Sequence, residues 1–320
     1  MDMNRRALLA AAASLALPAA RAQKFPDRPI RMIVPFFAGG NTDMIARTTG
    51  EGLTRSLGQP IVIDNKPGAG GLLALNELVR ARPDGYTIAL GTPSTQIITA
   101  LVTKDAKVDA IRETQPVGML CGVPLVLVVW AGLPVKTVPE LIEYARAKPG
   151  KLSFASDGIG TSTHLAMEMF CQFTGVQMVH VPYKGSYAAD MGNGLVHLAI
   201  AGARSQLALA EAGKIRVLAT ASEQRLPFLP QTPTIAEAGN LPGFDASSWY
   251  ALFLPAGAPS ELVATLAGAT RTATAHADYL ARITGAGFLA HPGGPVEVAA
   301  IMARDKKKWG DVVDRLGLKI

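Results

Sequence analysis

Short apolar segments alternate with helix-like segments along most of the chain, and this alternation constrains the fold more than any other feature. Several of these segments are continuous apolar runs, the pattern of strands covered on both faces. The predicted strands are 30–36, 61–64, 86–91, 124–130, 152–156, 178–181, 198–202, 216–220 and 249–254. Strands that alternate with helices form sheets through right-handed crossovers. The sequence therefore predicts an α/β fold with parallel or mixed sheets.

The chain is long enough for two domains. Its 320 residues suffice for two α/β units of ordinary size, each with its own core. We interpret the apolar strands near 125–130 and 249–254 as crossing strands that join two lobes. This gives a discontinuous domain I, residues 23–123 plus 247–320, and a domain II, residues 124–246. Strand-to-helix loops of both lobes would then line a cleft, where open α/β sheets bind ligands.

Residues 1–22 are predicted to be an export signal rather than part of the fold. Arg5 and Arg6 precede the apolar run 7–17, and residues 20–22 form a small-x-small cleavage site. The apolar run is shorter than the roughly 20 residues that span a bilayer. Paired arginines fit twin-arginine export, but ordinary secretory signals also carry adjacent basic residues, so both routes stay open. We expect a soluble, exported mature protein.

Charge and cysteine content exclude some functions. The formal net charge of +6 is mild, and the basic run 306–308 lies in a predicted amphipathic helix, where a solvated face explains it. We therefore expect no nucleic-acid partner. Cys121 and Cys171 both lie in apolar segments, as buried thiols usually do, and neither has metal-ligand spacing around it. Export permits a disulfide, but the sequence does not show that the two meet.

The segment IRMIVPFFAGGNTDMIAR, residues 30–47, runs a buried strand into a glycine turn and then a helix. A helix N-terminus leaves unpaired N–H groups and the positive end of a dipole, so it stabilises a carboxylate or phosphate. Asn41, Thr42 or Asp43 is expected to cap a helix that begins near Met44. The predicted ligand contacts in this first loop are Phe37, Ala38, Gly39, Gly40, Asn41, Thr42 and Asp43.

A second junction, FASDGIGTSTHL at residues 154–165, repeats this chemistry before a helix that runs to about Thr174. Amides and hydroxyls of the two loops are expected to converge on one carboxylate between the lobes. Each loop taken singly is also explained as an ordinary capped helix start. The predicted ligand contacts in this second loop are Ser156, Asp157, Gly160, Thr161, Ser162 and Thr163.

Other motifs do not complete a catalytic or cofactor site. GIGTST lacks the third glycine of a dinucleotide fingerprint, and the GAGG at 68–71 is not followed by the Lys-Ser/Thr of a phosphate loop. Ser156, Asp157 and His164 are near one another in sequence, but no G-x-S-x-G elbow is present. His180 and His291 have no zinc spacing. We expect no cofactor, no metal and no enzymatic activity.

The order of longer phrases points to a family. FPDRPIRMIVPFFAGGNTDMIAR, IVIDNKPGAGG, ARPDGYTIALGT, GTSTHLAMEMF, VHVPYKGS, AGKIRVLATAS, TPTIAEAG and GFDASSWYALFLPAGAP follow one another along the mature chain. In this order they resemble substrate-binding proteins of the tripartite tricarboxylate transporters, the Bug or TctC-like receptors. The resemblance implies a two-lobed periplasmic binding protein, type II-like, that closes by a hinge on a small carboxylate and delivers it to a membrane permease. It adds Thr92, Tyr183, Ala201 and Arg204 to the expected ligand contacts.

Three departures from the family pattern concern the distal half of the pocket. Where Ala201 stands the family commonly has aspartate, and where Arg204 stands it often has proline. Asp157 places an acid in a loop that commonly reads S-A-G-x-G-T-S, and Phe37 replaces a frequent proline or alanine. Arg204 either turns into the cleft and grips a second carboxylate, or starts a helix and faces water.

Three functions remain after this reading. The first is a monomeric, non-enzymatic receptor that feeds a permease. The second is a ligand-sensing receptor that acts on a membrane sensor, which needs the same closure. The third is an exported hydrolase or transferase that uses the same cleft catalytically.

Overall fold

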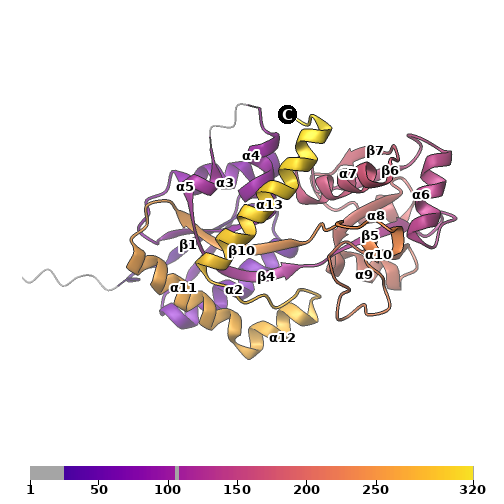
Figure 1. Cartoon of the computed structure of the whole chain (residues 1–320). Coiled ribbons are helices and arrows are strands. Elements are labelled where there is room, and N and C mark those ends of the chain that lie inside the picture. The colour runs from indigo at the N-terminus through magenta and orange to yellow at the C-terminus, as the bar shows by residue number, and fades with distance from the viewer. Residues whose placement is uncertain (1–24, 105–107, 320) are drawn as a thin grey trace, which may run out of the picture.

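The computed structural model describes residues 25–104 and 108–319, which form two lobes, each built on a five-stranded mixed sheet (Figure 1). The α/β fold class and the two-lobed architecture predicted from the sequence are confirmed. The predicted export signal, residues 1–22, lies outside the described residues. No helix among the described residues is long and apolar enough to cross a membrane.

The first sheet has the strand order β2-β1-β3-β10-β4. β1 pairs in parallel with β2 and β3, whereas β10 runs antiparallel between β3 and β4. Its strands are β1 (Ile30–Val34), β2 (Ile61–Asn65), β3 (Thr87–Gly91), β4 (Thr114–Val123) and β10 (Ser248–Pro255). The helical segments of this lobe are α2 (Asn41–Leu57), η1 (Ala69–Gly71), α3 (Leu72–Val79), η2 (Ser94–Ile98), α4 (Thr99–Val102), α5 (Ala110–Glu113), α11 (Ser260–Ala275), α12 (Ala277–Gly285) and α13 (Pro295–Leu316).

The second sheet has the strand order β7-β6-β8-β5-β9. β6 pairs in parallel with β7 and β8, and β5 runs antiparallel to β8 and β9. Its strands are β5 (Leu125–Trp130), β6 (Ser153–Ser156), β7 (Val179–Pro182), β8 (Leu198–Gly202) and β9 (Ile215–Thr220). The helices of this lobe are α6 (Val138–Ala147), α7 (Ser162–Thr174), α8 (Ala188–Gly192), α9 (Ala203–Glu211) and α10 (Ile235–Gly239).

All nine predicted strands are present, but β4 was not predicted. Pro116, Gly118 and Gly122 lie inside it, and these residue types usually interrupt strands. β4 is the last strand of its sheet, and its pairing with β10 shifts register twice. A terminal strand tolerates proline because the missing N–H need not reach a partner strand.

The chain does not pass between the lobes as predicted. Each of the two expected crossing strands, β5 and β10, pairs within a single sheet. The chain instead crosses at Pro124, where β4 leads directly into β5, and again between Ala246, whose N–H donates to the Ala221 carbonyl of the second lobe, and Ser248, where β10 begins. β5 and β10 are the antiparallel strands of the two sheets, which makes both sheets mixed.

The long helix α13 contacts both lobes. It packs on β4 in the first lobe and reaches α7 in the second (Figure 1). Gln172 Nε2 on α7 donates a hydrogen bond to the Val312 carbonyl at 3.2 Å. Trp309 of α13 is fully buried and packs into the hydrophobic core.

The structure also answers the questions left open about charge and thiols. Lys306 and Lys307 are exposed on α13, as predicted for a solvated face. Lys308 differs, because it is half-buried and faces Asp305 and Asp245 at 3.2 and 3.5 Å. Cys121 and Cys171 are both free thiols.

The buried carboxylate of Asp305 ties α13 to the start of β10. Asp305 is fully buried, and its Oδ2 accepts a hydrogen bond from Trp249 Nε1 at 2.8 Å. Its other oxygen lies beside Lys308 and Arg304, although without hydrogen-bond alignment. Removing one partner of a buried charge pair leaves the other charge uncompensated, which is strongly destabilising.

We predict that Asp305→Ala lowers the free energy of unfolding by about 3–5 kcal/mol, because Trp249 loses its buried acceptor and Lys308 loses its buried counter-charge. The matched control is Asp311→Ala on the same helix. Asp311 pairs with Lys307 on an exposed face and should change stability by less than about 0.5 kcal/mol. Urea unfolding of both variants measures the difference, and equal midpoints would contradict the assigned role of Asp305.

Candidate functional site

Four loops meet where the two lobes touch, and each follows the carboxyl end of a strand. They lead from β1 into α2, from β3 into η2, from β6 into α7 and from β8 into α9. Ser94 Oγ in the first lobe accepts a hydrogen bond from the Ser162 backbone N–H in the second at 2.9 Å. Arg204 Nη1 in the second lobe donates to Asn41 Oδ1 in the first at 3.3 Å. The structure therefore brings both predicted loops to one junction.

The first loop is held by Asp43 rather than by a helix cap. Asp43 Oδ2 accepts hydrogen bonds from the Gly39 backbone N–H and from Arg47 Nε, both at 2.9 Å. Burial raises the pKa of Asp43, but these hydrogen bonds outweigh it and leave that pKa below its ordinary value. Gly39 has a φ of +81°, a conformation that favours glycine.

The expected cap of this helix was wrong. α2 begins at Asn41, the residue at its cap position is Gly40, and no side chain caps it. The first backbone hydrogen bond of α2 runs from Met44 to the Gly40 carbonyl at 3.0 Å. The N–H groups of Asn41, Thr42 and Asp43 thus precede the hydrogen-bonded ladder, as the first N–H groups of any helix do. An anion placed there would meet several donors and the positive end of the helix dipole.

The remaining residues of the first loop differ in exposure. Phe37, Ala38, Gly39 and Gly40 are exposed, and Phe37 is exposed to 56%. Asn41 is half-buried, and Thr42 is buried. The Thr42 hydroxyl donates to Tyr250 Oη at 3.1 Å, so its side chain is fixed against β10.

The hydroxyls of Thr161 and Thr163 in the second loop form hydrogen bonds within the loop. Thr161 caps α7, donates to the Gly158 carbonyl at 2.8 Å and accepts from His164 N–H. Thr163 Oγ1 accepts from the Asp157 backbone N–H at 3.0 Å. This differs from the expectation that Thr161–Thr163 present their hydroxyls to a ligand. Both side chains are buried, and the Ser162 amide is bonded to Ser94.

Glycine amides of the second loop are bonded internally too. The Gly158 N–H donates to Ser156 Oγ at 3.2 Å, and the Gly160 N–H donates to His164 Nδ1 at 3.2 Å. Gly160 is itself buried. The loop is therefore rigid, and its backbone conformation is set by its own side chains.

Asp157 is the charged group that this loop adds to the junction. It keeps an exposed surface, yet the surrounding protein desolvates its carboxyl and raises its pKa, which the hydrogen bond from Thr163 offsets only in part. Burial raises the pKa of Tyr187, and the charge of Asp157 raises it further. The same two causes act on Tyr250, which belongs to the other lobe. The Asp157 carboxyl therefore acts electrostatically on tyrosines of both lobes.

The four residues added by the family resemblance lie in different surroundings. Thr92 and Ala201 are each 2% exposed, and Ala201 packs in the hydrophobic cluster beneath β5 and β8. Tyr183 is half-buried and its hydroxyl donates to Asp190 Oδ2 at 2.7 Å. Burial and this carboxylate raise the pKa of Tyr183 to about 12. Arg204 is exposed and is the second residue of α9. Its guanidinium donates to Asn41 of the first loop.

Sequence reasoning missed Ser94, Tyr187 and Tyr250. Ser94 follows β3 in the segment GTPST, which repeats the pattern of an apolar strand followed by small polar residues. That pattern would have identified a third loop. Tyr187 and Tyr250 carry no local signal, because only the fold brings them within electrostatic range of Asp157.

The buried serine of the second loop does not form a nucleophile. Ser156 is fully buried, and its hydroxyl lies 2.6 Å from His180 Nε2, not against His164. A nucleophilic serine needs an accessible oxygen and a base that is oriented by a third group. Among the described residues, no group of three or more His, Cys, Asp and Glu is placed to hold a metal ion.

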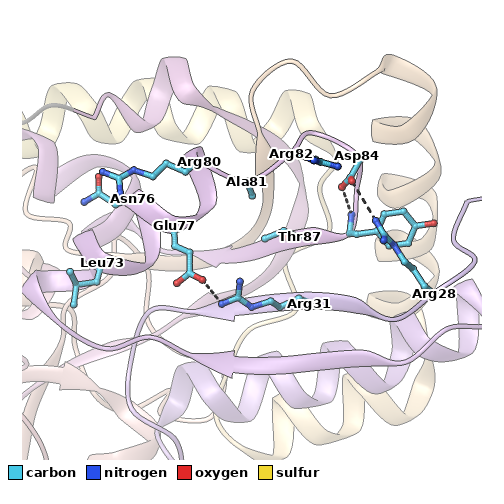
Figure 2. A pocket seen from close by; sticks show the side chains of 11 residues that line it. Arg28, Arg31, Leu73, Asn76, Glu77, Arg80, Ala81, Arg82, Asp84 and Thr87 are labelled. Carbon is cyan, nitrogen blue, oxygen red and sulfur yellow. Dashed lines mark hydrogen bonds and ion pairs between the residues drawn. The ribbon is translucent and has the colours of Figure 1, made fainter.

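A cavity of about 770 Å³ lies elsewhere, at the starting ends of β1 and β3 (Figure 2). Arg31 points toward Glu77 there, and Arg28 pairs with Asp84 at 3.6 Å while lying over the Tyr86 ring. Arg28 and Arg31 are thus paired with carboxylates, and Arg80 and Arg82 complete the basic lining. Ligands of open α/β sheets bind beyond the carboxyl ends of strands, so the loop junction remains the candidate site.

Comparison with known proteins agrees with this geometry. The family described as tripartite tricarboxylate transporter family receptor matches residues 45–318. Protein BugT of Bordetella pertussis is 33% identical over 99% of this chain and 100% of its own length. Two solved structures from Rhodopseudomonas palustris are similar. Rpa4515 with adipate has a TM-score of 0.84 and 35% identity over 92% of this chain and 99% of that one. MatC with bound malate has a TM-score of 0.83 and 31% identity over 90% of this chain and 100% of that one.

The family is one of solute-binding receptors of transporters and not of enzymes. The match spans both lobes and three of the four loops, because the first loop precedes residue 45. The full-length relatives extend the similarity through the first loop as well. This chain belongs to the tripartite tricarboxylate transporter receptor family, the Bug or TctC group of solute-binding proteins.

Proposed function

We propose that this protein is a periplasmic receptor that captures a small organic acid between its lobes and delivers it to a tripartite tricarboxylate transporter permease. The observation that carries the proposal is the junction of loops from both lobes. At its edge lie the backbone N–H groups of Asn41, Thr42 and Asp43, which precede the first helical hydrogen bond of α2. Similar receptors are described with adipate and with malate, which supports an organic acid as ligand. The hinges would be at Pro124 and at residues 246–248, between domains 23–123 plus 247–320 and 124–246.

One carboxylate of the ligand would bind at the start of α2. Asn41 and Thr42 supply backbone donors, and Thr42 is fixed by Tyr250. Because the hydroxyls of Thr161 and Thr163 are bonded within their own loop, the second loop would act as a rigid wall. Charge stabilisation would then come chiefly from the helix N-terminus, where a carboxylate gains about 0.3–1 kcal/mol, or up to about 2 when partly buried.

A second acidic group of the ligand would bind Arg204. The guanidinium lies at the junction, and its present partner is the neutral side-chain oxygen of Asn41. An ionised carboxylate is a stronger acceptor than an amide oxygen, and arginine binds it in bidentate geometry. A dicarboxylate, or an aromatic acid with a distal acidic group, would thus replace Asn41 as the partner of Arg204.

A receptor of this kind binds its ligand stoichiometrically and releases it unchanged. Native mass spectrometry of the purified protein should show one co-purified small acid for each chain.

Titration with adipate or malate at 100 times its dissociation constant should add about 2.7 kcal/mol to the free energy of unfolding. Small-angle scattering should give a smaller radius of gyration with ligand, because ligand contacts to both lobes favour the closed state. Turnover of the acid, or no binding of any acid, would contradict the proposal.

Arg204→Ala tests the assignment of the second acidic group. We expect the variant to lose about 1.5–3 kcal/mol of binding free energy for a dicarboxylate such as adipate, as for a hydrogen bond to a charged group. Binding of a monocarboxylate of similar length should be unchanged. Arg282→Ala is the matched control, because Arg282 pairs with Glu51 on an exposed surface. Isothermal calorimetry measures the affinities of the wild type, Arg204→Ala and Arg282→Ala. An unchanged affinity of Arg204→Ala for the dicarboxylate would assign Arg204 to the solvated surface.

A further inference from the structure

Two stacked imidazole rings lie directly behind the second loop. His164 on the first turn of α7 and His180 on β7 have ring centroids 3.9 Å apart and nearly parallel planes, 17° from one another. The ring of Phe154 on β6 continues the stack, 4.9 Å from that of His180. His164 is only 3% exposed. The proposed binding function does not use these two rings as ligand contacts.

Each imidazole is bonded to one end of the loop. His164 Nδ1 accepts the backbone N–H of Gly160 at 3.2 Å. His180 Nε2 lies 2.6 Å from Ser156 Oγ, and this oxygen is in turn bonded to the backbone of Gly158. Gly158 and Gly160 both have positive φ, so the turn between them adopts a conformation that favours glycine. The turn that contains Asp157 is thus held from behind by two histidines.

The hydrogen bond from Gly160 defines the protonation state of His164. A backbone N–H can donate only to a ring nitrogen that carries no proton, so Nδ1 is bare and the ring proton is on Nε2. Nε2 faces Glu168 Oε1 of the same helix at 3.6 Å. β6 contributes the uncharged Phe154 and Ser156 to the surroundings of the rings. Glu168 is therefore the charged group that acts on both histidines.

The geometry points to His164 and His180 as positioning residues that hold the second loop in its binding conformation, and His164 does so only while its ring is neutral. The inference rests on the proposed function of that loop. A proton added at Nδ1 of His164 would point at the Gly160 N–H, and two donors cannot share a hydrogen bond. The turn would then have to move away from the ring. A charge on one ring also opposes a charge on the other at this short distance.

The pH dependence has a definite sign. The hydrogen bond from Gly160 excludes a proton from His164 Nδ1, so the loop conformation seen here binds fewer protons than a released loop. Burial, and then the charge of His164, lower the pKa of His180 to about 4, which acts in the same direction. A histidine whose pKa is lowered in one conformation stabilises that conformation fully at pH values above the ordinary histidine pKa, about 6.5. This stabilisation is lost as pH falls toward 4. Ligand affinity should accordingly decrease on acidification.

The test is a titration with adipate at pH 8 and pH 5 of the wild type and two variants of His164. In His164→Asn the side-chain oxygen can accept the Gly160 N–H but cannot be protonated, whereas His164→Leu has no acceptor. We expect the wild type to lose at least about tenfold more affinity than His164→Asn between the two pH values. His164→Leu should bind at least about fivefold more weakly than wild type at pH 8. Adipate itself titrates identically in every experiment. The difference in pH dependence between wild type and His164→Asn therefore reports the protonation of the His164 ring.

His276→Asn is the matched control, since His276 is exposed at the start of α12 and lies outside the junction. Its pH profile should equal that of the wild type. Superimposable profiles for wild type and His164→Asn would overturn the inference, as would wild-type affinity in His164→Leu. If the wild type binds neither adipate nor any other organic acid at pH 8, the proposed function fails instead.

A ligand-free measurement decides the inference if His164→Leu does not fold or if no acid binds. In ¹⁵N-labelled full-length protein, the ring nitrogens of His164 should report a bare Nδ1 at pH 8. The amide signal of Gly160 should then shift with the same midpoint as the His164 ring on acidification. A Gly160 amide that does not follow the ring, or a protonated Nδ1 at pH 8, would overturn the positioning role.

Discussion

The pairing of β10 between β3 and β4 is the constraint on which the rest of the structure depends. β10 returns from the second lobe and inserts antiparallel into a sheet whose other strands are parallel. Its neighbour β4 leads through Pro124 straight into β5, so the two sheets are joined by adjacent segments. Because the lobes are joined there, the loops that follow β1 and β3 meet those that follow β6 and β8. The buried contact between Trp249 and Asp305 anchors this pairing to α13.

Most polar side chains at the junction stabilise the loops rather than point toward a ligand. Asp43 binds the Gly39 amide, and Thr161 and Thr163 satisfy the turn that contains Asp157. Buried polar groups must find partners, and those partners are found within the loops themselves. What remains available is the set of N–H groups at the start of α2, together with the charges of Asp157 and Arg204. This division explains why short polar loops suffice to build a rigid site.

Local patterns in the sequence predicted most of the fold but only part of the site. Nine strands were visible as apolar runs, and β4 was missed because Pro116 and Gly118 are acceptable only in a terminal strand. The two loops were recognisable from glycines beside strand ends. The contacts of Ser94 with Ser162 and of Asn41 with Arg204 join residues 68 and 163 positions apart, and no local pattern encodes them. The same holds for the stacking of His164 on His180.

The contacts that join the loops are weak enough to leave closure to the ligand. The Arg204–Asn41 hydrogen bond is exposed and 3.3 Å long, and the Ser94–Ser162 bond joins two neutral groups. A bond between neutral groups contributes about 0.5–1.5 kcal/mol, and a bond with a charged donor such as Arg204 contributes about 1.5–3 kcal/mol at most. Moving a two-state equilibrium from 1:99 to 99:1 takes about 5.5 kcal/mol, more than either bond supplies. In the proposed receptor, a ligand that bridges the N-terminus of α2 and Arg204 would supply the difference, because it contacts both lobes only when they are closed.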